Sequence, residues 1–176
     1  NNCTNNDIAA QLNLQHLSKF GLLYSPFTGS HYSTLGLALL GRSLERAWGQ
    51  QYEDYMVSTI FPGIGMKQMT GFTYSPDVVD NMATGYHIIP NANGTYTQEV
   101  SSANTDEMGW SAPAAGAYTT PEDMSSFFKW MFGPHGNNSI LSQSFVDEYI
   151  APGMLMANGI ELFGQGTWET FYANGY

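Results

Sequence analysis

The chain has 176 residues, of which 43% are hydrophobic and 14% aromatic, so it is long and apolar enough to fold around a core. Fifteen acidic residues against five basic residues give a formal net charge of -10, which excludes the basic surface that nucleic-acid binding requires. No apolar run approaches the roughly 18 residues of a membrane span. We therefore expect a folded chain with no nucleic-acid partner and no membrane span.

The N-terminal part of the sequence has the apolar spacing of helices. A first helix is predicted over residues 7–20. A second is predicted from about Ser33, a favoured N-cap residue, to Trp48, and Gly49 ends it. Four apolar residues at helical intervals are expected to face the core on this second helix: Leu37, Leu40, Leu44 and Ala47.

The middle of the sequence changes from helical spacing to a strand pattern. A third helix is predicted over residues 51–61 and should end before Pro62. Two short runs within residues 85–100 flank the turn dipeptide Asn93-Gly94. This arrangement predicts a β-hairpin.

The C-terminal part carries two clear helix starts. Thr120 followed by Pro121 and two acidic residues predicts a helix over residues 120–132. Ser142 is the expected N-cap of a further helix that ends before Pro152. Glycines and aromatics alternate roughly over residues 159–176, which predicts strands.

Motifs for metal and cofactor binding are missing from the sequence. The four histidines are scattered at positions 16, 31, 87 and 135, and no Cys-x-x-Cys or His-Glu-x-x-His spacing occurs. No phosphate-binding glycine-rich loop or dinucleotide motif occurs either. We expect no metal and no organic cofactor.

The Ser-x-x-Lys pattern matches at Ser126–Lys129. On a helix this spacing places the amine one turn from the hydroxyl, where it can take the serine proton. The match falls in the middle of the helix predicted over residues 120–132, among apolar residues. We therefore interpret it as a surface pair rather than a nucleophile and its base.

The single cysteine and three glycosylation sequons bear on localisation. Cys3 is either a free thiol or one half of a disulfide whose partner lies outside this sequence. The sequons begin at Asn2, Asn93 and Asn137, and the last two lie in turn-like sequence typical of surface loops. We expect a secreted, extracellular glycoprotein.

Three segments of the chain carry a family resemblance. They are residues 22–56 (LLYSPFTGSHYSTLGLALLGRSLERAWGQQYEDYM), 60–72 (IFPGIGMKQMTGF) and 113–132 (PAAGAYTTPEDMSSFFKWMF). In this order they are similar to a Tyr-x-Asn motif with its Gly-x-x-Leu-Leu-Gly helix, a Pro-Leu-Gly-Met-x-x-Thr stretch and a Gly-Gly-x-x-Ser-Thr-x-x-Asp helix start. These belong to the serine β-lactamase and penicillin-binding-protein superfamily, in its class C β-lactamase and esterase-like branch.

The resemblance implies roles for two residues. Tyr32 falls on the family tyrosine, whose oxygen helps to deprotonate the nucleophilic serine and passes a proton to the leaving group. Thr34 falls on the family asparagine, which binds the substrate carbonyl; threonine lacks the carboxamide, so this site favours an ester over a β-lactam or a peptide amide. His31 adjoins the tyrosine, but the family has no catalytic histidine there.

The resemblance implies an α+β fold, the mostly helical middle region of a β-lactamase-like (DD-peptidase-like) protein with a short β-hairpin and C-terminal strands. Residues 1–176 would form a single partial domain that lacks the N-terminal nucleophile segment and the C-terminal core strands. We expect a fragment of a serine hydrolase that acts on a small-molecule ester or amide and is inactive as the isolated chain. The rest of the parent chain would then be a partner, and could hold the disulfide partner of Cys3.

Two alternatives remain. The chain could belong to a secreted non-catalytic β-lactamase-like pseudoenzyme with a structural or binding role, which Thr34 and the low charge permit. It could also be an unrelated secreted helical binding domain, which a Tyr32 side chain pointing into the apolar core, away from any cleft, would favour.

Overall fold

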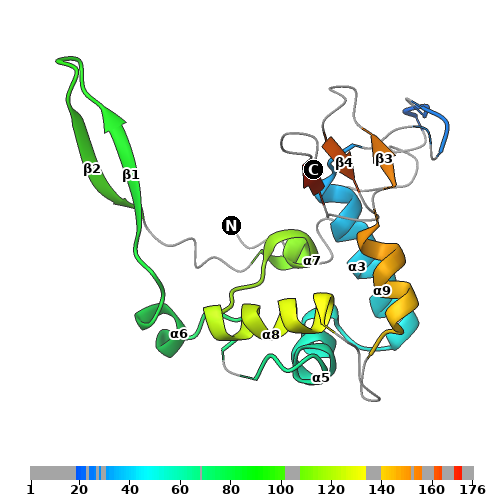
Figure 1. The fold of residues 1–176 in the computed structure, drawn as a ribbon. Coiled ribbons are helices and arrows are strands. Elements are labelled where there is room, and N and C mark those ends of the chain that lie inside the picture. The colour runs from blue at the N-terminus through cyan, green and yellow to red at the C-terminus, as the bar shows by residue number, and fades with distance from the viewer. Residues whose placement is uncertain are drawn as a thin grey trace.

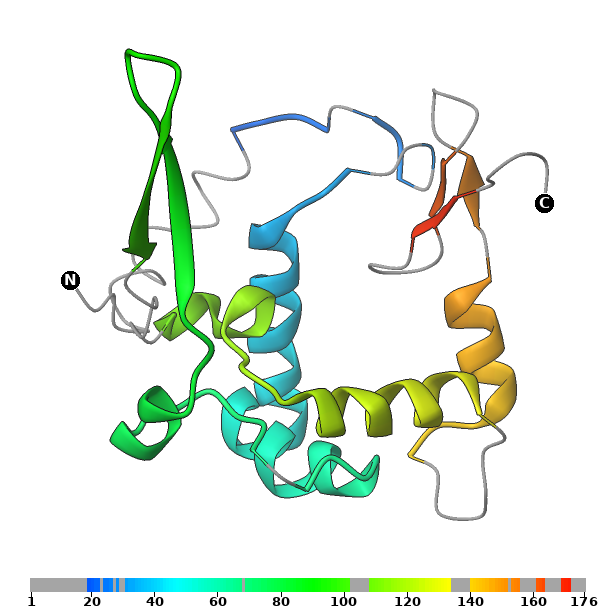
Figure 2. The same cartoon turned by 60° about the vertical axis from the view of Figure 1, so that its left-hand side comes forward.

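The computed structural model describes residues 19–22, 24–26, 28, 31–67, 69–101, 108–133, 140–151, 153–155, 161–163 and 169–171. About half of the described part is helical and it also contains two small antiparallel sheets, which confirms the predicted α+β class. Figure 2 shows α3 (Thr34–Trp48) and α9 (Gln143–Ile150) both upright, with α8 (Pro121–Phe132) crossing between their lower ends. The hairpin of β1 (Gly85–Pro90) and β2 (Tyr96–Ser101) projects on the opposite side from α9 (Figure 1).

Helix α3 begins and ends where its sequence predicts. Ser33 is the N-cap in an extended conformation, and its hydroxyl oxygen accepts a hydrogen bond of 2.9 Å from the Gly36 N–H. Gly49 is the C-cap with φ at 71°, a left-handed conformation that favours glycine, and its N–H donates to the Glu45 carbonyl. Both helix ends are therefore determined by local side-chain and backbone chemistry.

The buried face of α3 differs from the predicted one. The expected apolar stripe is only partly buried: Leu37 and Leu44 are half-buried, whereas Leu40 is 56% exposed and Ala47 is also exposed. The buried residues of the helix are instead Ala38 and Gly41. Small residues let the backbone of α7 (Ala112–Ala115) approach α3 closely, and this close approach decides which face is buried.

Replacing Gly41 with alanine tests this close approach. A Cβ at this position would lie 2.2 Å from Cβ and 2.5 Å from Cγ of Pro113, so α3 and α7 would have to separate. We expect Gly41→Ala to destabilise the protein by about 2 kcal/mol, although alanine is intrinsically the better helix former. Urea denaturation followed by circular dichroism measures the change. Ser43→Ala, at an exposed position of the same helix, is the control, and an equal or stabilising effect of Gly41→Ala would contradict the close contact.

The third predicted helix continues past its expected end. It consists of α4 (Tyr52–Tyr55), the π-helical turn Met56–Ile60 and α5 (Phe61–Gly63), so Pro62 lies inside helical structure rather than after it. The Phe61 N–H donates to the Met56 carbonyl, five residues earlier. Such a wide turn shifts the hydrogen-bond register by one residue and accommodates the proline, which has no N–H to donate.

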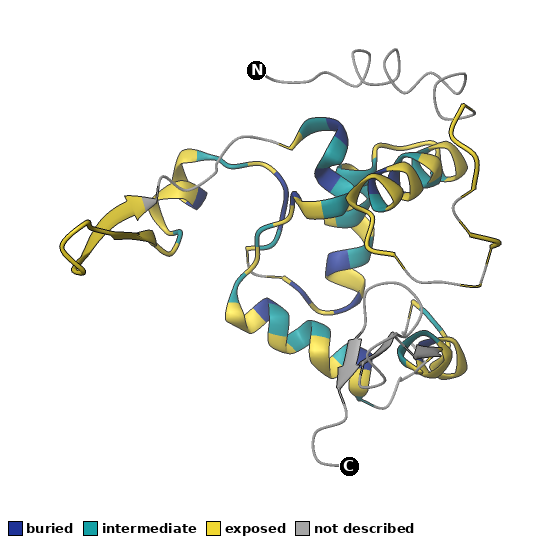
Figure 3. Cartoon of the chain, turned by 90° about the horizontal axis from the view of Figure 1, so that it is seen from above, coloured by how far each residue is buried: buried dark blue, intermediate teal, exposed yellow. Residues whose placement is uncertain are grey.

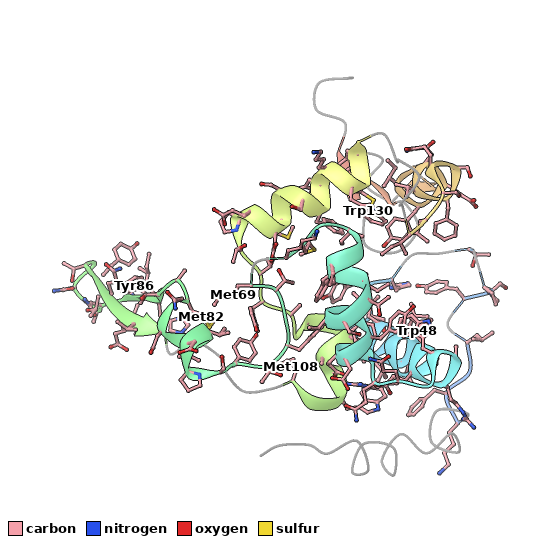
Figure 4. All side chains as sticks on the ribbon, turned by 90° about the horizontal axis from the view of Figure 1, so that it is seen from below. Trp48, Met69, Met82, Tyr86, Met108 and Trp130 are labelled. Atoms are coloured by element: carbon pink, nitrogen blue, oxygen red, sulfur yellow. The ribbon has the colours of Figure 1, made fainter. Side chains whose placement is uncertain are left out.

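The main apolar core lies where this helical stretch meets α7 and α8. Its buried members are Phe61, Ile64, Met66, Phe72 and Ala112. Aromatic rings add contacts around it, including Phe61 stacked on Phe72 at a centroid distance of 6.0 Å. Figure 4 shows Trp48 and Trp130 in this helical body, well separated from Tyr86 on the hairpin.

The β1–β2 hairpin forms around the predicted turn. Gly85 pairs with Ser101 at one end and Pro90 with Tyr96 at the other. Every residue of β1 is exposed, and the hairpin is coloured as exposed in Figure 3. In an antiparallel pair, residues directly opposite each other lie on the same face, and so does every second residue along each strand. One face of the hairpin therefore carries Tyr86, Ile88, Tyr96 and Val100.

The remaining predictions are largely confirmed within the described residues. Thr120 caps α8 and Ser142 caps α9, each through its side-chain oxygen. A three-stranded antiparallel sheet follows, in the order β3 (Met154–Leu155), β4 (Glu161–Phe163) and β5 (Glu169–Phe171). Of the helix predicted over residues 7–20, residues 7–18 lie outside the described part, and residues 19 and 20 are not helical. The sequence did not predict α6 (Pro76–Asp80), the 3-10 turn Gly109–Ser111 or α7.

Candidate functional site

Tyr32 lies immediately before the N-terminal cap of α3. It precedes Ser33, whose side chain and carbonyl accept hydrogen bonds from the Gly36 and Leu37 N–H groups. The Tyr32 side chain is 88% exposed. Its hydroxyl makes no hydrogen bond to another described residue, so on this part of the structure it is accessible to a ligand. The packing of Tyr32 in an apolar core that would favour an unrelated helical binding domain is therefore not observed.

The residues on either side of Tyr32 are also exposed. The His31 ring stacks on the Tyr24 ring, with centroids 5.1 Å apart and an interplanar angle of 18°. Thr34 is the first residue of α3, and its hydroxyl makes no hydrogen bond to another described residue. Tyr32 and Thr34 therefore lie together at the start of one helix, with both side chains exposed.

Arg42 anchors α3, two turns into the helix from this site. Its Nε donates to the Trp110 carbonyl at 3.0 Å and its Nη2 to the Gly109 carbonyl at 2.7 Å. Its two terminal nitrogens also form a bidentate pair with Glu53, at 3.0 and 2.6 Å, and Nη1 pairs with Glu45. A rigid helix start holds any group placed on it at a defined position, so Arg42 contributes indirectly to the position of Tyr32.

The charge of Arg42 is maintained by its partners. Burial by itself would lower the pKa of the guanidinium, but hydrogen bonds and charge interactions with Glu53 and Glu45 outweigh this effect. The pKa of Arg42 is therefore raised above its ordinary value. The Glu45 carboxylate also accepts a hydrogen bond of 2.9 Å from the Tyr52 N–H, which joins α3 to α4.

Two other tyrosines are poor candidates for accepting a proton. Burial raises the pKa of Tyr52, and the charge of Glu53 raises it further. Burial also raises the pKa of Tyr118, with a smaller contribution from Tyr74. A phenol whose pKa lies above its ordinary value stays protonated at neutral pH. Tyr32 differs from both in being almost fully exposed.

The Ser-x-x-Lys match is not arranged as a catalytic pair. The Ser126 hydroxyl donates to the Glu122 carbonyl of its own helix at 3.3 Å. Lys129 is exposed, near the end of α8. Ser126 is thus bonded to the α8 backbone, in line with its interpretation as part of a surface pair.

Asp123 has a structural role that the sequence did not reveal. The sequence predicts it as an acidic residue in the first turn of α8, yet its side chain is only 1% exposed. Its Oδ2 accepts hydrogen bonds of 3.0 Å from the Met69 N–H and 2.6 Å from the Thr70 hydroxyl. Thr70 also bonds to Thr119 at 2.8 Å, so the carboxylate joins the start of α8 to residues 69–70. The aspartate of the matched Gly-Gly-x-x-Ser-Thr-x-x-Asp pattern was the signal available for this role.

An apolar cavity lies among the described residues. Its volume is about 820 Å³, and α5, α8 and α9 contribute its walls. Its polar lining residues include Thr70, Thr119 and Tyr149, and none of the lining residues that the structure describes is acidic or a histidine. The described residues contain no group of three or more histidine, cysteine, aspartate or glutamate side chains that could hold a metal ion. None of the described helices is long and apolar enough to cross a bilayer.

The three predicted glycosylation sites are not equally placed. Asn93 is exposed in the loop between β1 and β2. Asn2 and Asn137 lie outside the described residues, and so does Cys3.

Comparison with known proteins gives consistent matches along the chain. A family model described as Beta-lactamase matches residues 4–174. Beta-lactamase-like protein 2 from Dictyostelium discoideum is 35% identical over 159 residues, which cover 90% of this chain and 27% of that protein. Beta-lactamase-like protein 4 from the same organism is 32% identical over 186 residues, covering 98% of this chain and 30% of that protein. The chain therefore spans less than a third of the length of these relatives.

A solved structure supports the fold as well. The D-alanine carboxypeptidase from Burkholderia cenocepacia superposes with a TM-score of 0.58 at 25% sequence identity. The match covers 86% of this chain and 39% of that structure.

Proposed function

Because the chain belongs to the Beta-lactamase family, we propose that it supplies the tyrosine part of the active site of a serine hydrolase that acts on an ester or amide. The observation that carries this proposal is the position of Tyr32. Its side chain is 88% exposed at the start of a capped helix, and Arg42 anchors that helix to the neighbouring segments. A group presented in this way can contact a substrate without moving the helix.

In the proposed reaction, a serine hydroxyl attacks the carbonyl carbon of the substrate. The Tyr32 oxygen takes the proton from this serine and then donates it to the leaving oxygen or nitrogen. Water releases the acyl group in a second step. A phenol has an ordinary pKa of about 10, so this role requires cations beside Tyr32 that favour its ionised form.

The nucleophile is proposed to come from outside these 176 residues. The Ser-x-x-Lys match within them is Ser126–Lys129, and the Ser126 hydroxyl is bonded to the backbone of its own helix. On this proposal the isolated chain does not hydrolyse esters, whereas the full protein that contains it does.

Thr34 supports an ester as the substrate. The matched family position is an asparagine, whose carboxamide can donate and accept hydrogen bonds through separate atoms. The threonine hydroxyl at the first residue of α3 has one oxygen for both roles. We propose that this substitution weakens recognition of β-lactams and peptide amides more than that of simple esters. The same substitution favours the second candidate, a secreted non-catalytic member with a binding role.

Replacing Tyr32 with phenylalanine separates these candidates. Full-length protein that contains this chain should hydrolyse nitrophenyl esters, and Tyr32→Phe should lower kcat/KM by about a hundred-fold or more, the range expected for loss of proton transfer. The substitution removes only an exposed hydroxyl, so the melting temperature should not change. Release of nitrophenolate, followed by absorbance, measures the rates.

The matched control is Tyr96→Phe on the hairpin, where the tyrosine is 72% exposed. This variant should retain the activity of the unmodified protein. Equal activity of Tyr32→Phe and Tyr96→Phe would show that Tyr32 does not transfer the proton. If the full-length protein neither hydrolyses esters and amides nor reacts with a probe that acylates serine, the second candidate, a non-catalytic protein, would be supported instead.

A further inference from the structure

We propose that Asn93 is a site of N-linked glycosylation, at which the side-chain nitrogen carries an oligosaccharide at the tip of the β1–β2 hairpin. The inference is independent of the hydrolase proposal, since it concerns a different element and a different reaction. It rests on the acceptor sequence Asn93-Gly94-Thr95, the conformation of the loop and the exposure of the hairpin.

The loop is a tight turn that places Asn93 at its apex. The Gly94 N–H donates to the Asn91 carbonyl at 3.0 Å, and the Asn91 N–H donates to the Thr95 carbonyl at 2.8 Å. Gly94 has φ at 80°, in the left-handed region where glycine is unstrained. The three residues of the sequon therefore occupy defined positions between the ends of the two strands.

The side chain of Asn93 is oriented by Thr95. Its Oδ1 accepts one hydrogen bond of 3.1 Å from the Thr95 N–H and another of 2.7 Å from the Thr95 hydroxyl. A backbone N–H can only donate, so the oxygen of the amide must face Thr95 and the nitrogen must face away from it. The Nδ2 atom makes no hydrogen bond to any described residue. The atom that would receive the sugar is the one left available.

Further hydrogen bonds hold Thr95, the threonine that the acceptor sequence requires. The Asn91 side-chain nitrogen donates to the Thr95 hydroxyl oxygen at 3.0 Å and to the Thr97 hydroxyl oxygen at 2.9 Å. Asn91 thus links the loop to Thr97 in β2, and the Thr95 hydroxyl both accepts from Asn91 and donates to Asn93.

A transferase could reach this loop from several directions. Asn93 and all neighbouring loop residues are exposed. A Cβ placed on Gly94 would meet no atom within 4 Å other than those of its chain neighbours, so the space beside Gly94 is open. The hairpin extends away from the helical body in Figures 1 and 2, so the tip lies far from the packed helices.

An oligosaccharide here would also suit the surface of the hairpin. Tyr86, Ile88, Tyr96 and Val100 are exposed apolar side chains on one face. Such a face favours association with other apolar surfaces. A bulky, hydrated glycan attached next to it would oppose that association.

The proposed modification is a group transfer from a lipid-linked oligosaccharyl diphosphate. The Asn93 Nδ2 forms a bond to the anomeric carbon of the first sugar, and the bond from that carbon to the diphosphate oxygen breaks. The lipid diphosphate leaves with the bonding electrons, and one proton of the amide passes to a base of the transferase. No oxidation or reduction takes place.

Site-specific mass spectrometry tests this proposal. The full-length protein is produced with a secretory leader in cultured eukaryotic cells, purified from the medium and treated with peptide N-glycosidase in water enriched in heavy oxygen. The glycosidase converts a glycosylated asparagine to aspartate and introduces one oxygen from the water. We expect the peptide containing Asn93 to acquire the heavy oxygen in most molecules.

Four variants test which residues the modification requires. Asn93→Gln and Thr95→Ala should abolish the labelling of this peptide, whereas Thr95→Ser should retain it. Asn81→Gln is the matched control, because it alters an exposed asparagine that lies outside the loop and does not begin a sequon. Retained labelling in this control shows that the labelling follows the acceptor sequence.

A parallel sample without glycosidase distinguishes spontaneous deamidation of Asn93 from removal of a glycan. The Asn93-Gly94 dipeptide can form aspartate without any glycan, and that product would appear in both samples. Secreted protein with an unmodified Asn93 peptide would overturn the proposal, and so would heavy oxygen that appears equally without the glycosidase.

Discussion

Replacing Arg42 with methionine is expected to lower the free energy of unfolding by about 3 kcal/mol, the lower end of the range for breaking a buried ion pair. The Arg42 side chain is only 11% exposed, and it pairs with Glu45 and Glu53 while donating to two backbone carbonyls. Methionine fills a similar volume but donates no hydrogen bond, so the two carbonyls and Glu53 lose the donor that Arg42 supplies, while Glu45 keeps its hydrogen bond from the Tyr52 N–H. The two glutamates are themselves about three-quarters buried, so water replaces the lost interactions only in part.

Urea denaturation followed by far-UV circular dichroism measures this effect. Arg46→Met is the matched control, because Arg46 lies one turn further along α3 and is exposed. Its replacement should change stability by no more than about 0.5 kcal/mol. Arg42→Lys should fall between the two, since lysine keeps the charge but lacks the planar fork that binds Glu53 at two points. Equal stability of Arg42→Met and Arg46→Met would show that the network does not anchor α3.

Replacing Asp123 with alanine should have an effect of similar size. The carboxylate is buried and accepts hydrogen bonds from the Met69 N–H and the Thr70 hydroxyl. A hydrogen bond to a charged group contributes about 1.5 to 3 kcal/mol, so loss of both predicts a destabilisation of about 3 kcal/mol or more. Because the carboxylate joins α8 to residues 69–70, those residues should also become more susceptible to proteolysis.

The control for Asp123 is another aspartate on a helix surface. Asp147 is exposed on α9 and accepts a hydrogen bond from Gln143 within its own helix. Asp147→Ala should cost about 0.5 kcal/mol at most. Asp123→Asn should be milder than Asp123→Ala, since it retains one acceptor oxygen. If Asp123→Ala unfolds at the same urea concentration as Asp147→Ala, the buried carboxylate does not stabilise the fold.

Element boundaries could be predicted wherever they depend on neighbouring residues. Ser33 and Gly49 bound α3, and Thr120 and Ser142 cap the two later helices, as expected from their sequence positions. The Asn93-Gly94 turn likewise forms between two strands. Caps and tight turns are determined by hydrogen bonds within a few residues, which a sequence displays directly.

Packing between distant segments could not be predicted in the same way. Leu40 belongs to a regular apolar stripe, yet Gly41 is buried instead because Pro113, far along the chain, packs directly against it. Pro62 was expected to end a helix, but a π-helical turn before it keeps the chain helical. Periodicity shows that a helix is amphipathic, but the partner element decides which side is buried.

The candidate site likewise combines a residue that the sequence identified with contacts between distant segments that it did not. The sequence identified Tyr32 through a family resemblance, and the structure places it exposed beside the cap of α3. It did not identify Arg42 or Asp123 as anchoring residues. Arg42 bonds to carbonyls 67 and 68 residues away, and Asp123 bonds to groups 53 and 54 residues away. Contacts between residues so far apart in the sequence are not visible in local composition or periodicity, although Asp123 coincides with the aspartate of the matched family pattern.

The isolation of the β1–β2 hairpin has a consequence for how the protein exchanges its amide hydrogens with solvent. None of the described helices or strands packs extensively against it, and two strands alone are marginally stable in water. The hairpin should therefore open and close as a cooperative unit of its own while α3 and α8 remain folded. The backbone amides that pair β1 with β2 should exchange through this local opening. Their exchange should be many times faster than that of helix amides, which exchange only on global unfolding.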